Sequence, residues 1–363
     1  MNPFANVAEF ESLRAAAFDG ADRFAAHVRR LTFTAEDELL EAVVSERVQR
    51  MIETAIGTAK AVMLVGPPGT GKTHTLRKVL QQVQADPARV GLSTAPGVRW
   101  ATPEEEWTFD RVVLGQTVVD GEIVSEEGVL LSALRNDEWL ILDETNRADM
   151  DRVLGGVLTW LSGQRVQIGN WRSAQHPGAS TPVYLSWGDD ESTEIVEDIP
   201  NLVEYRVGTS WRLLGTYNAV DAQRVFRMGQ ALTRRFKHVP ILPVPPTEFA
   251  AILAVHNPDG PNAAEIAACV EALYRAHLTA PGAALGPALF TDIPGYLHRA
   301  MQQHPDALFD ELVAEAYVTS VGALVARLDD VTLEDLRIAM ADQSALDGDA
   351  WRWVLSQLQA LGA

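Results

Sequence analysis

The sequence predicts an α/β domain, in which a parallel sheet is flanked by helices, followed by a smaller region built of helices. An apolar, strand-like stretch at residues 61–65 runs into a glycine-rich turn and then into a segment whose apolar residues keep helical spacing. Two further apolar runs, 139–142 and 211–217, are short and lead into polar residues, which is typical of strands buried in a parallel sheet. Beyond a proline-rich break at 242–246, nearly every segment has the periodicity of a helix.

The chain divides into three predicted parts. Residues 1–35 are expected to form an N-terminal extension of short amphipathic helices, residues 36–244 the α/β domain, and residues 245–363 a helical lid with further C-terminal helices. A long helix is expected at 36–58, with Gly57 as its C-terminal cap. The helices expected after the proline-rich break span residues 247–256, 263–277, 293–303, 307–328, 332–341 and 349–361.

The composition is that of a globular protein with a substantial core. The chain has 363 residues, a length that suits two domains of ordinary size or one large α/β domain with an appendage. Of these residues 47% are hydrophobic and 22% charged, as in other globular proteins. The formal net charge is −19, whereas a surface that binds nucleic acid by neutralising phosphates is usually basic. We therefore expect no autonomous DNA binding.

No segment of the sequence predicts export or membrane insertion. No apolar run approaches the ~18 residues that a membrane-spanning helix needs, and the first residues lack the basic start and apolar stretch of a secretory signal. The single cysteine, Cys269, lies in an apolar helical run, where packing is its expected role. These features predict a cytoplasmic protein.

The middle of the α/β domain is less regular. Residues 89–134 have the pattern of loops with short strands, and apolar residues at 150–161 keep helical spacing. Gly155 and Gly156 weaken that helix and predict the close approach of a neighbouring group.

Residues 163–210 are too long for a simple connection and predict an insertion. The segments 166–168 and 183–187 have the composition of strands in a hairpin-like arrangement. Residues 189–204 carry seven acidic side chains and no basic one. This run is interpreted either as a solvated face or as a projecting loop that meets a basic partner.

The glycine-rich turn has the spacing of a phosphate-binding loop. Gly66, Gly71, Lys72 and Thr73 satisfy the pattern G-x-x-x-x-G-K-[ST] between the strand and the helix that this motif requires. Backbone N–H groups of such a loop surround the β-phosphate at the positive end of the helix, and the lysine reaches the β- and γ-phosphates. An accidental glycine-rich turn is the alternative. The residues expected to bind nucleotide are Gly66, Pro67, Pro68, Gly69, Thr70, Gly71, Lys72, Thr73, His74 and Asp143.

Polar residues at the ends of the later strands supply the groups that hydrolysis needs. Asp143 is suited to hold Mg²⁺ beside Thr73, so these two are the expected metal ligands, and Glu144 can polarise a water for attack on the γ-phosphate. Asn218 supplies an amide to orient that water. Simpler interpretations are a helix cap for the two acidic residues and an ordinary turn for Asn218.

A cation that stabilises the transition state is also needed. Arg234 and Arg235 are the candidate cations. Solvated charges at a helix end are the alternative interpretation of these two arginines.

Four segments, in order, resemble the signatures of AAA+ ATPases: GPPGTGKT, LILDETNRAD, LLGTYNAVD and ALTRRF. The DETNRAD form is similar to the clade that holds the MoxR chaperones, the dynein-related modules and the McrB motor. The stretches WTFDRVVLG and GVLLSAL are most similar to McrB-like modules. The resemblance covers roughly residues 40–300 and implies a P-loop AAA+ domain with a parallel sheet, followed by a helical lid.

The resemblance also implies a role for each candidate residue. Asp143 and Glu144 match the Walker B pair, and Asn218 matches sensor 1. Arg234 or Arg235 matches the arginine finger, which acts on nucleotide bound by the neighbouring subunit. The family's Asn-Arg pair, which supports the active site or the subunit boundary, corresponds to Asn146 and Arg147.

The sequence departs from the family pattern at two points. Thr145 stands where the clade usually has an aliphatic residue, and the segment around Ala288 and Leu289 lacks a sensor 2 arginine, since Arg299 comes too late. The insertion at 163–210 falls between Walker B and sensor 1, where the clade carries extra hairpins that face the pore or the substrate.

The resemblance implies an AAA+ NTPase that uses ATP or GTP with Mg²⁺ in an oligomeric ring, expected to be a hexamer, to remodel or translocate a partner. That partner is a client protein or a separate nuclease subunit. The alternative is a nucleotide-dependent switch or scaffold with little turnover, for example one that regulates a McrC-like nuclease; the missing sensor 2 favours it, whereas Glu144 and Asn218 oppose it. A P-loop kinase does not suit the acidic pair. We expect ATP rather than GTP, although the McrB motor uses GTP without a guanine signature.

Overall fold

The computed structural model describes residues 45–119, 121–172, 180–218, 228–346 and 348–362. The N-terminal extension expected at residues 1–35, and the first part of the helix expected at 36–58, lie outside the described residues. The remaining part of that helix is α4, Glu46–Thr58, which begins where the Ser45 side chain accepts a hydrogen bond from the Val48 N–H.

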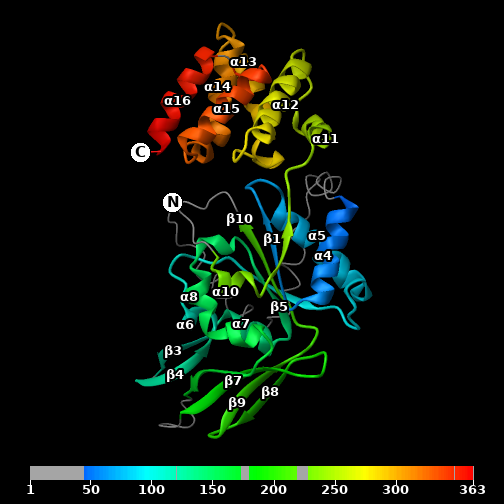
Figure 1. Cartoon of the computed structure of the whole chain (residues 1–363), viewed down its shortest axis with the longest axis vertical. Coiled ribbons are helices and arrows are strands. Elements are labelled where there is room, and N and C mark those ends of the chain that lie inside the picture. The colour runs from blue at the N-terminus through cyan, green and yellow to red at the C-terminus, as the bar shows by residue number, and fades with distance from the viewer. Residues whose placement is uncertain (1–44, 120, 173–179, 219–227, 347, 363) are drawn as a thin grey trace, which may run out of the picture. The chain divides into compact units, whose positions relative to one another are not determined.

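A five-stranded parallel sheet forms the centre of the α/β domain, in the order β11-β1-β10-β5-β2 (Figure 1). Its strands are β1 (Ala61–Gly66), β2 (Gly97–Ala101), β5 (Glu138–Leu142), β10 (Leu213–Asn218) and β11 (Lys237–Pro240). The three strands expected from apolar runs are the three central ones, which confirms that prediction. The two outer strands have weaker apolar patterns, because β2 is only half-buried and β11 is mostly exposed.

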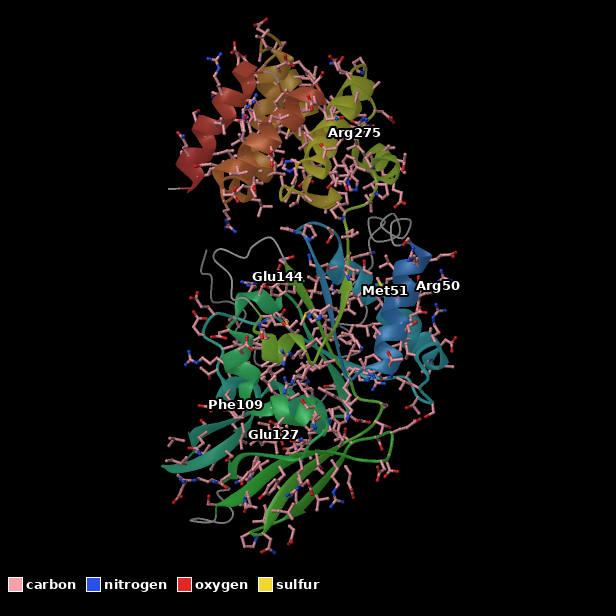
Figure 2. All side chains as sticks on the ribbon, viewed as in Figure 1. Arg50, Met51, Phe109, Glu127, Glu144 and Arg275 are labelled. Atoms are coloured by element: carbon pink, nitrogen blue, oxygen red, sulfur yellow. The ribbon has the colours of Figure 1, made fainter. Side chains whose placement is uncertain are left out.

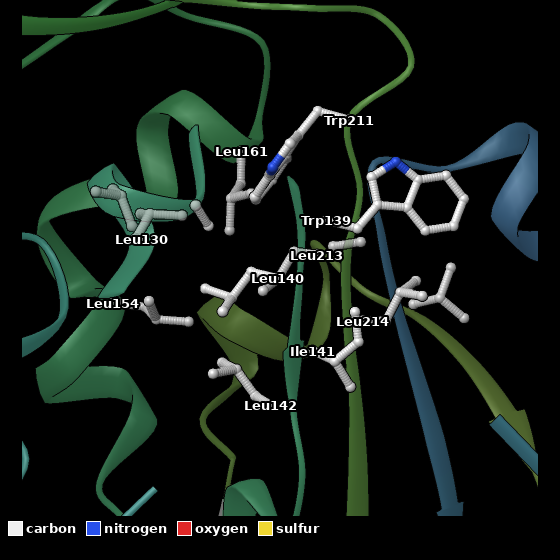
Figure 3. Packing of buried hydrophobic residues seen from close by; sticks show 14 of the residues in the cluster. Leu130, Trp139, Leu140, Ile141, Leu142, Leu154, Leu161, Trp211, Leu213 and Leu214 are labelled. Carbon is white, nitrogen blue, oxygen red and sulfur yellow. The ribbon is translucent and has the colours of Figure 1, made fainter. Parts of the chain in front are cut away.

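Helices cover both faces of the sheet, which confirms the predicted α/β fold. On one face lie α4 and α5, Lys72–Ala85; on the other lie α7, Val129–Arg135, α8, Met150–Leu154, and α10, Gln230–Thr233 (Figure 1). Alternate residues of β5 contact opposite faces: Figure 3 shows Leu140 and Leu142 directed toward Leu154 of α8, and Ile141 directed toward Leu214. The continuous apolar run in the sequence follows from this two-sided burial.

Two glycine expectations have different outcomes. Gly57 is not the C-terminal cap of α4; the cap is Ala59, and a Cβ on Gly57 would lie 3.1 Å from the Val90 carbonyl oxygen. Gly57 is therefore a place of close packing. The close approach expected at Gly155 and Gly156 is confirmed at Gly156, where a Cβ would lie 2.5 Å from the Phe109 ring, but not at Gly155, around which the structure leaves open space. A 3₁₀ turn, Gly155–Val157, accordingly separates α8 from α9, Leu158–Leu161.

The insertion at 163–210 forms a second sheet in the order β6-β7-β9-β8. Its strands are β6 (Val166–Trp171), β7 (Thr181–Trp187), β8 (Glu194–Asp198) and β9 (Leu202–Val207). The expected pairing of the first two is confirmed, and β8 and β9 are additional. The inner residues of β7 and β9 are buried in the same core as the main sheet: Val183, Leu185, Val203, Tyr205 and Val207.

Packing of tryptophans and hydrogen bonds from an arginine connect this second sheet to the α/β domain. Trp160 and Trp187 stack with ring centroids 4.9 Å apart, and Trp211 packs against both. The Arg135 guanidinium donates to Glu127 and to Glu197 and Tyr205 of the insertion. The acidic run is therefore only partly a free solvated face, since Glu197, Glu204 and Glu194 pair with arginines from inside and outside the insertion.

A second addition, the hairpin of β3 (Leu114–Val119) and β4 (Glu122–Glu127), precedes β5. It lies within the segment expected to contain loops and short strands. Val118 is 67% exposed, and Val119 and Ile123 are also exposed. The hairpin adjoins the second sheet, because the Ser125 N–H donates to the Arg172 carbonyl.

The C-terminal part is helical, as predicted. Its helices are α11 (Pro246–His256), α12 (Ala263–Thr279), α13 (Ile293–Gln303), α14 (Phe309–Val325), α15 (Asp330–Asp342) and α16 (Gly348–Gly362). They enclose their own core, in which the fully buried His277 contacts Tyr317. Among the described residues, no helix is both long and apolar enough to cross a membrane.

Candidate nucleotide-binding site

The predicted phosphate-binding loop connects the end of β1 to the start of α5. Gly69 and Gly71 have φ values of 74° and 76°, a conformation that a side chain disfavours. Gly71 is the N-terminal cap of α5 and offers no side chain to its N–H groups, so the first turn keeps donors available for an anion. Gly66 must also be glycine, because a Cβ there would lie 2.0 Å from the Ile241 carbonyl oxygen.

Lys72 is 7% exposed and lies over the loop that precedes it. Its ammonium group donates to the carbonyl oxygens of Gly66, at 3.0 Å, and Pro67, at 2.7 Å. The Thr70 hydroxyl also donates to the Pro67 carbonyl, at 3.0 Å. The lysine charge therefore sits inside the curve of the loop, where a phosphate bound by the loop would meet it. His74 follows in the first turn of α5.

The two expected metal ligands are in contact. The Thr73 hydroxyl donates to Asp143 Oδ1 at 2.7 Å, across 70 residues of sequence. A hydroxyl and a carboxylate are the hard oxygen donors that Mg²⁺ takes, and Mg²⁺ usually completes its shell with phosphate oxygens and water rather than with protein groups. The residues present thus fit the ion. Across the described part of the chain, no cluster of three or more His, Cys, Asp or Glu side chains forms a separate metal site.

Glu144 directly follows Asp143 in a strained backbone conformation, with φ 56° and ψ 53°. Its N–H donates to the Thr216 hydroxyl at 2.8 Å, and that hydroxyl in turn donates to Asp143 Oδ1 at 2.6 Å. Figure 2 labels Glu144 beside the end of the central sheet where β10 terminates. Thr216 was not among the candidates from sequence. Its signal is a polar residue within an apolar strand, two positions before Asn218 and so on the same side of β10.

Asn218 ends β10, next to the loop, since β1 and β10 pair with Gly66 opposite Asn218. Its backbone N–H donates to Oδ1 of Asn146, a member of the Asn-Arg pair, at 3.1 Å. The Arg147 guanidinium lies 3.3 Å from Glu144 Oε2, and both side chains are about half exposed. The structure therefore gathers Asn146, Arg147 and Asn218 around the acidic pair.

The two candidate arginines lie in different environments. Arg235 donates to the Ser162 hydroxyl at 3.0 Å and to the Ala231 carbonyl at 2.7 Å. Arg234 is exposed, and its side chain makes no hydrogen bond or ion pair with any residue that the structure describes. The helix that precedes them, α10, has Gly229 as its N-terminal cap, and the Gly229 N–H donates to the Asp151 carboxylate.

The segment without a sensor 2 arginine meets the phosphate-binding loop through its backbone. The N–H groups of Gly286 and Ala288 donate to the carbonyls of Pro68, at 2.8 Å, and Gly69, at 3.2 Å. A Cβ on Gly69 would lie 2.7 Å from Leu289 Cγ. Position 288 is therefore beside the loop, and it carries a methyl group where the family resemblance implied a cation.

A parallel sheet of this order, a phosphate-binding loop after its central strand, and an acidic pair at the neighbouring strand define a P-loop nucleotide-binding module of the AAA+ type. The family profile described as AAA domain (dynein-related subfamily) matches residues 61–236. This segment, a little under half of the chain, therefore resembles an AAA domain of the dynein-related subfamily, a class of modules whose members hydrolyse nucleoside triphosphates.

Other comparisons are weaker. No curated protein matches the sequence. NtrX from Brucella abortus in complex with ADP is 16% identical, with a TM-score of 0.42, over 99% of this chain and 77% of that chain. Cdc6p from Pyrobaculum aerophilum is 13% identical, with a TM-score of 0.41, over 87% of this chain and 85% of that chain. Both similarities are low, and the assignment depends on the family match and the site.

Proposed function

We propose that the chain is an AAA+ NTPase that hydrolyses ATP with Mg²⁺ and works as a ring, with six subunits as the expected number. The observation that carries the proposal is the contact of Thr73 with Asp143 at 2.7 Å, beside Glu144 and the phosphate-binding loop. This contact supports a metal-binding pair and a candidate general base beside the start of α5, where the backbone N–H groups can donate to an anion. Mg²⁺ would be held by Thr73 and Asp143 and would neutralise charge on the phosphates.

The protein groups divide the work of hydrolysis. Lys72 and the loop N–H groups hold the β- and γ-phosphates. Glu144 accepts the proton of the attacking water, the new bond forms to the γ-phosphorus, and the bond to the β–γ bridging oxygen breaks. Asn218 orients that water from the end of β10.

A cation from a second subunit completes the site in this proposal. Arg235 is bound to its own subunit at Ser162, whereas Arg234 is exposed. We therefore assign the arginine finger to Arg234 and a supporting role to Arg235. A finger of this kind contributes ~10³–10⁵ in rate, so an isolated subunit would be nearly inactive, and activity would depend on assembly.

We assign coupling to a partner to the second sheet, β6 to β9, and to the β3–β4 hairpin. The second sheet is fastened to the nucleotide domain by Trp160, Trp187 and Arg135, so movement of one is transmitted to the other. The β3–β4 hairpin carries exposed apolar residues suited to contact a client. A separate nuclease subunit, as in McrB-like systems, is one form that this partner can take.

A nucleotide-dependent switch with little turnover is the second candidate. The observation that favours it is Ala288, which lies beside the loop without a cationic side chain. Such a protein would bind nucleotide and change its contacts with a partner, for instance a McrC-like nuclease, without sustained hydrolysis.

Steady-state hydrolysis of ATP and of GTP with Mg²⁺, over a wide range of protein concentration, distinguishes the two. We expect specific activity with ATP to rise steeply with concentration and to vanish in Lys72→Ala. The same preparations are examined by analytical ultracentrifugation with a slowly hydrolysed ATP analogue, to count the subunits. Nucleotide binding with near-zero turnover of both nucleotides at every protein concentration would favour the switch. Higher turnover of GTP than of ATP would show that the preferred substrate is GTP.

A further inference from the structure

A single buried hydroxyl, that of Thr216, contacts both members of the acidic pair. Thr216 is 1% exposed, and its Oγ1 lies 2.6 Å from Asp143 Oδ1 and 2.8 Å from the backbone nitrogen of Glu144. A hydroxyl has one hydrogen and two lone pairs, so it can donate to the carboxylate while it accepts from the N–H. Both bonds are made at the same time.

The bond to Asp143 fixes the carboxylate that faces the metal position. Asp143 Oδ1 accepts from Thr73 on one side and from Thr216 on the other. Hydrogen bonds to a carboxylate are stronger than those between neutral groups. With two donors on one oxygen, the orientation of the carboxylate is set by β10 and α5 together, before any ion is bound.

The bond to Glu144 holds an unfavourable backbone. Glu144 has φ 56°, a region that residues other than glycine rarely adopt. Such a conformation persists where its surroundings over-determine it. The Thr216 hydroxyl supplies that restraint at the Glu144 N–H, and the direction of the Glu144 side chain depends on it.

A neighbouring buried threonine makes a different kind of contact. Thr145 is also 1% exposed, but its hydroxyl donates to the backbone carbonyl of Thr216 at 2.8 Å and touches neither the Asp143 carboxylate nor the Glu144 N–H. The two threonines therefore share burial and side-chain chemistry, whereas only Thr216 contacts the acidic pair.

We propose that Thr216 is a positioning residue, whose hydroxyl presents Asp143 to the metal ion and Glu144 to the attacking water. This inference rests on the proposed NTPase function for its kinetic consequences. The Thr216 hydroxyl is buried and bonded to the two acidic residues, so its effect on catalysis passes through them. A residue that only filled the core would affect stability and leave the metal requirement unchanged.

The test compares Thr216→Val, which keeps the shape and loses the hydroxyl, with Thr216→Ser, which keeps the hydroxyl. Thr145→Val is the matched control, since it removes a buried threonine hydroxyl one residue beyond Glu144. Each full-length variant is assayed for kcat, KM and the Mg²⁺ concentration at half-maximal rate. The affinity for a fluorescent ATP analogue is measured in EDTA and across a Mg²⁺ titration, and thermal unfolding is followed in parallel.

We expect Thr216→Val to lower kcat by ~10–100-fold, the range of a lost hydrogen bond to a charged group. It should raise the Mg²⁺ requirement of turnover and of nucleotide binding, and leave affinity in EDTA unchanged. Thr216→Ser should stay within about threefold of the wild type in all of these. Thr145→Val should lower the unfolding temperature while it keeps the wild-type Mg²⁺ requirement.

Wild-type kcat and Mg²⁺ requirement in Thr216→Val would overturn the inference and leave the proposed function standing. An inactive wild-type protein would count against the proposed function, and the Mg²⁺ dependence of analogue binding would then decide the inference by itself. Should the valine variant not fold, Thr216→Ala is compared with Thr216→Ser, and equal Mg²⁺ requirements in those two would also overturn it.

Discussion

The Arg235 guanidinium donates to the Ser162 hydroxyl at 3.0 Å, which binds it to the end of α9 in its own subunit. Its neighbour Arg234 is exposed, and its side chain has no hydrogen-bonding partner in the part of the chain that the structure describes. Two adjacent residues with the same charge thus have different freedom to reach another molecule.

Arg234→Ala should bind nucleotide normally but lose ~10³-fold or more in kcat, because the transition-state charge is left uncompensated. Mixing it with Glu144→Gln should restore part of the activity, since sites with an intact Glu144 then receive an intact finger from the neighbour. Turnover of the mixture is measured against each variant alone. Arg235→Ala, the matched control, should instead lower the unfolding temperature. Absence of recovery in the mixture would contradict action across a subunit boundary.

Glu144→Gln should keep nucleotide binding and lose ~10²–10⁴-fold in turnover, because the amide cannot accept the proton of the attacking water. The exposed carboxylate Glu126 on β4 provides the control, and Glu126→Gln should retain wild-type turnover. Binding is measured with a fluorescent ATP analogue and turnover by phosphate release. A turnover of Glu144→Gln equal to that of the wild type would remove Glu144 from the catalytic role.

Gly286→Ala should separate the Gly286–Ala288 segment from the phosphate-binding loop. The added Cβ would lie 2.0 Å from the Gly69 carbonyl carbon. Because that atom belongs to the backbone, no small side-chain adjustment can relieve the clash. The hydrogen bonds to Pro68 and Gly69 would be lost, at a cost of ~1 kcal/mol each. We expect lower stability in urea unfolding and weaker nucleotide binding.

The control for that variant is Gly155→Ala, where the structure leaves open space around the added methyl group. It should unfold and bind nucleotide like the wild type. If Gly286→Ala also behaved like the wild type, the backbone contact between this segment and the loop would be wrong.

Much of the fold was predictable because its patterns are local. The three central strands are continuous apolar runs, and each expected C-terminal helix is present, since burial on one or two faces leaves a direct mark on the sequence. The outer strands β2 and β11 were not singled out, because edge strands bury less. The β3–β4 hairpin and the strands β8 and β9 depend on pairing across the chain, which periodicity alone does not reveal.

The candidate site was likewise predictable only in part. The contact between Thr73 and Asp143 was expected, because the loop and the strand end are each marked by a motif. Thr216 was missed, because its role lies in one hydroxyl that reaches two residues more than 70 positions away. The difference between Arg234 and Arg235 depends on where Ser162 lies in space, which the sequence of either arginine does not contain.

The last prediction concerns His277, which is fully buried in the helical part of the chain. Its Nδ1 lies 2.7 Å from the Ala283 carbonyl oxygen and its Nε2 lies 2.8 Å from the Tyr317 hydroxyl. A neutral ring satisfies both, with Nδ1–H donating to the carbonyl and Nε2 accepting from the hydroxyl. Burial lowers the pKa of His277 to about 4, because the charged ring would be desolvated.

The unfolded chain, in which a histidine titrates near its ordinary pKa of ~6.5, therefore binds more protons than the folded chain at intermediate pH. The contribution of His277 to stability is fully present above pH ~6.5 and is lost as the pH falls toward about 4. Its full size is about 3 kcal/mol, from ~1.4 kcal/mol for each unit of the shift in pKa.

Urea unfolding, followed by tryptophan fluorescence between pH 4.5 and 7.5, measures this effect. His277→Gln should be less stable than the wild type at pH 7, yet its free energy of unfolding should fall less between pH 6.5 and 4.5, because glutamine does not titrate. Carboxylates contribute equally to both proteins. The difference between their slopes of unfolding free energy against pH therefore isolates the contribution of His277. Equal slopes for His277→Gln and the wild type would show that His277 is not held neutral by burial.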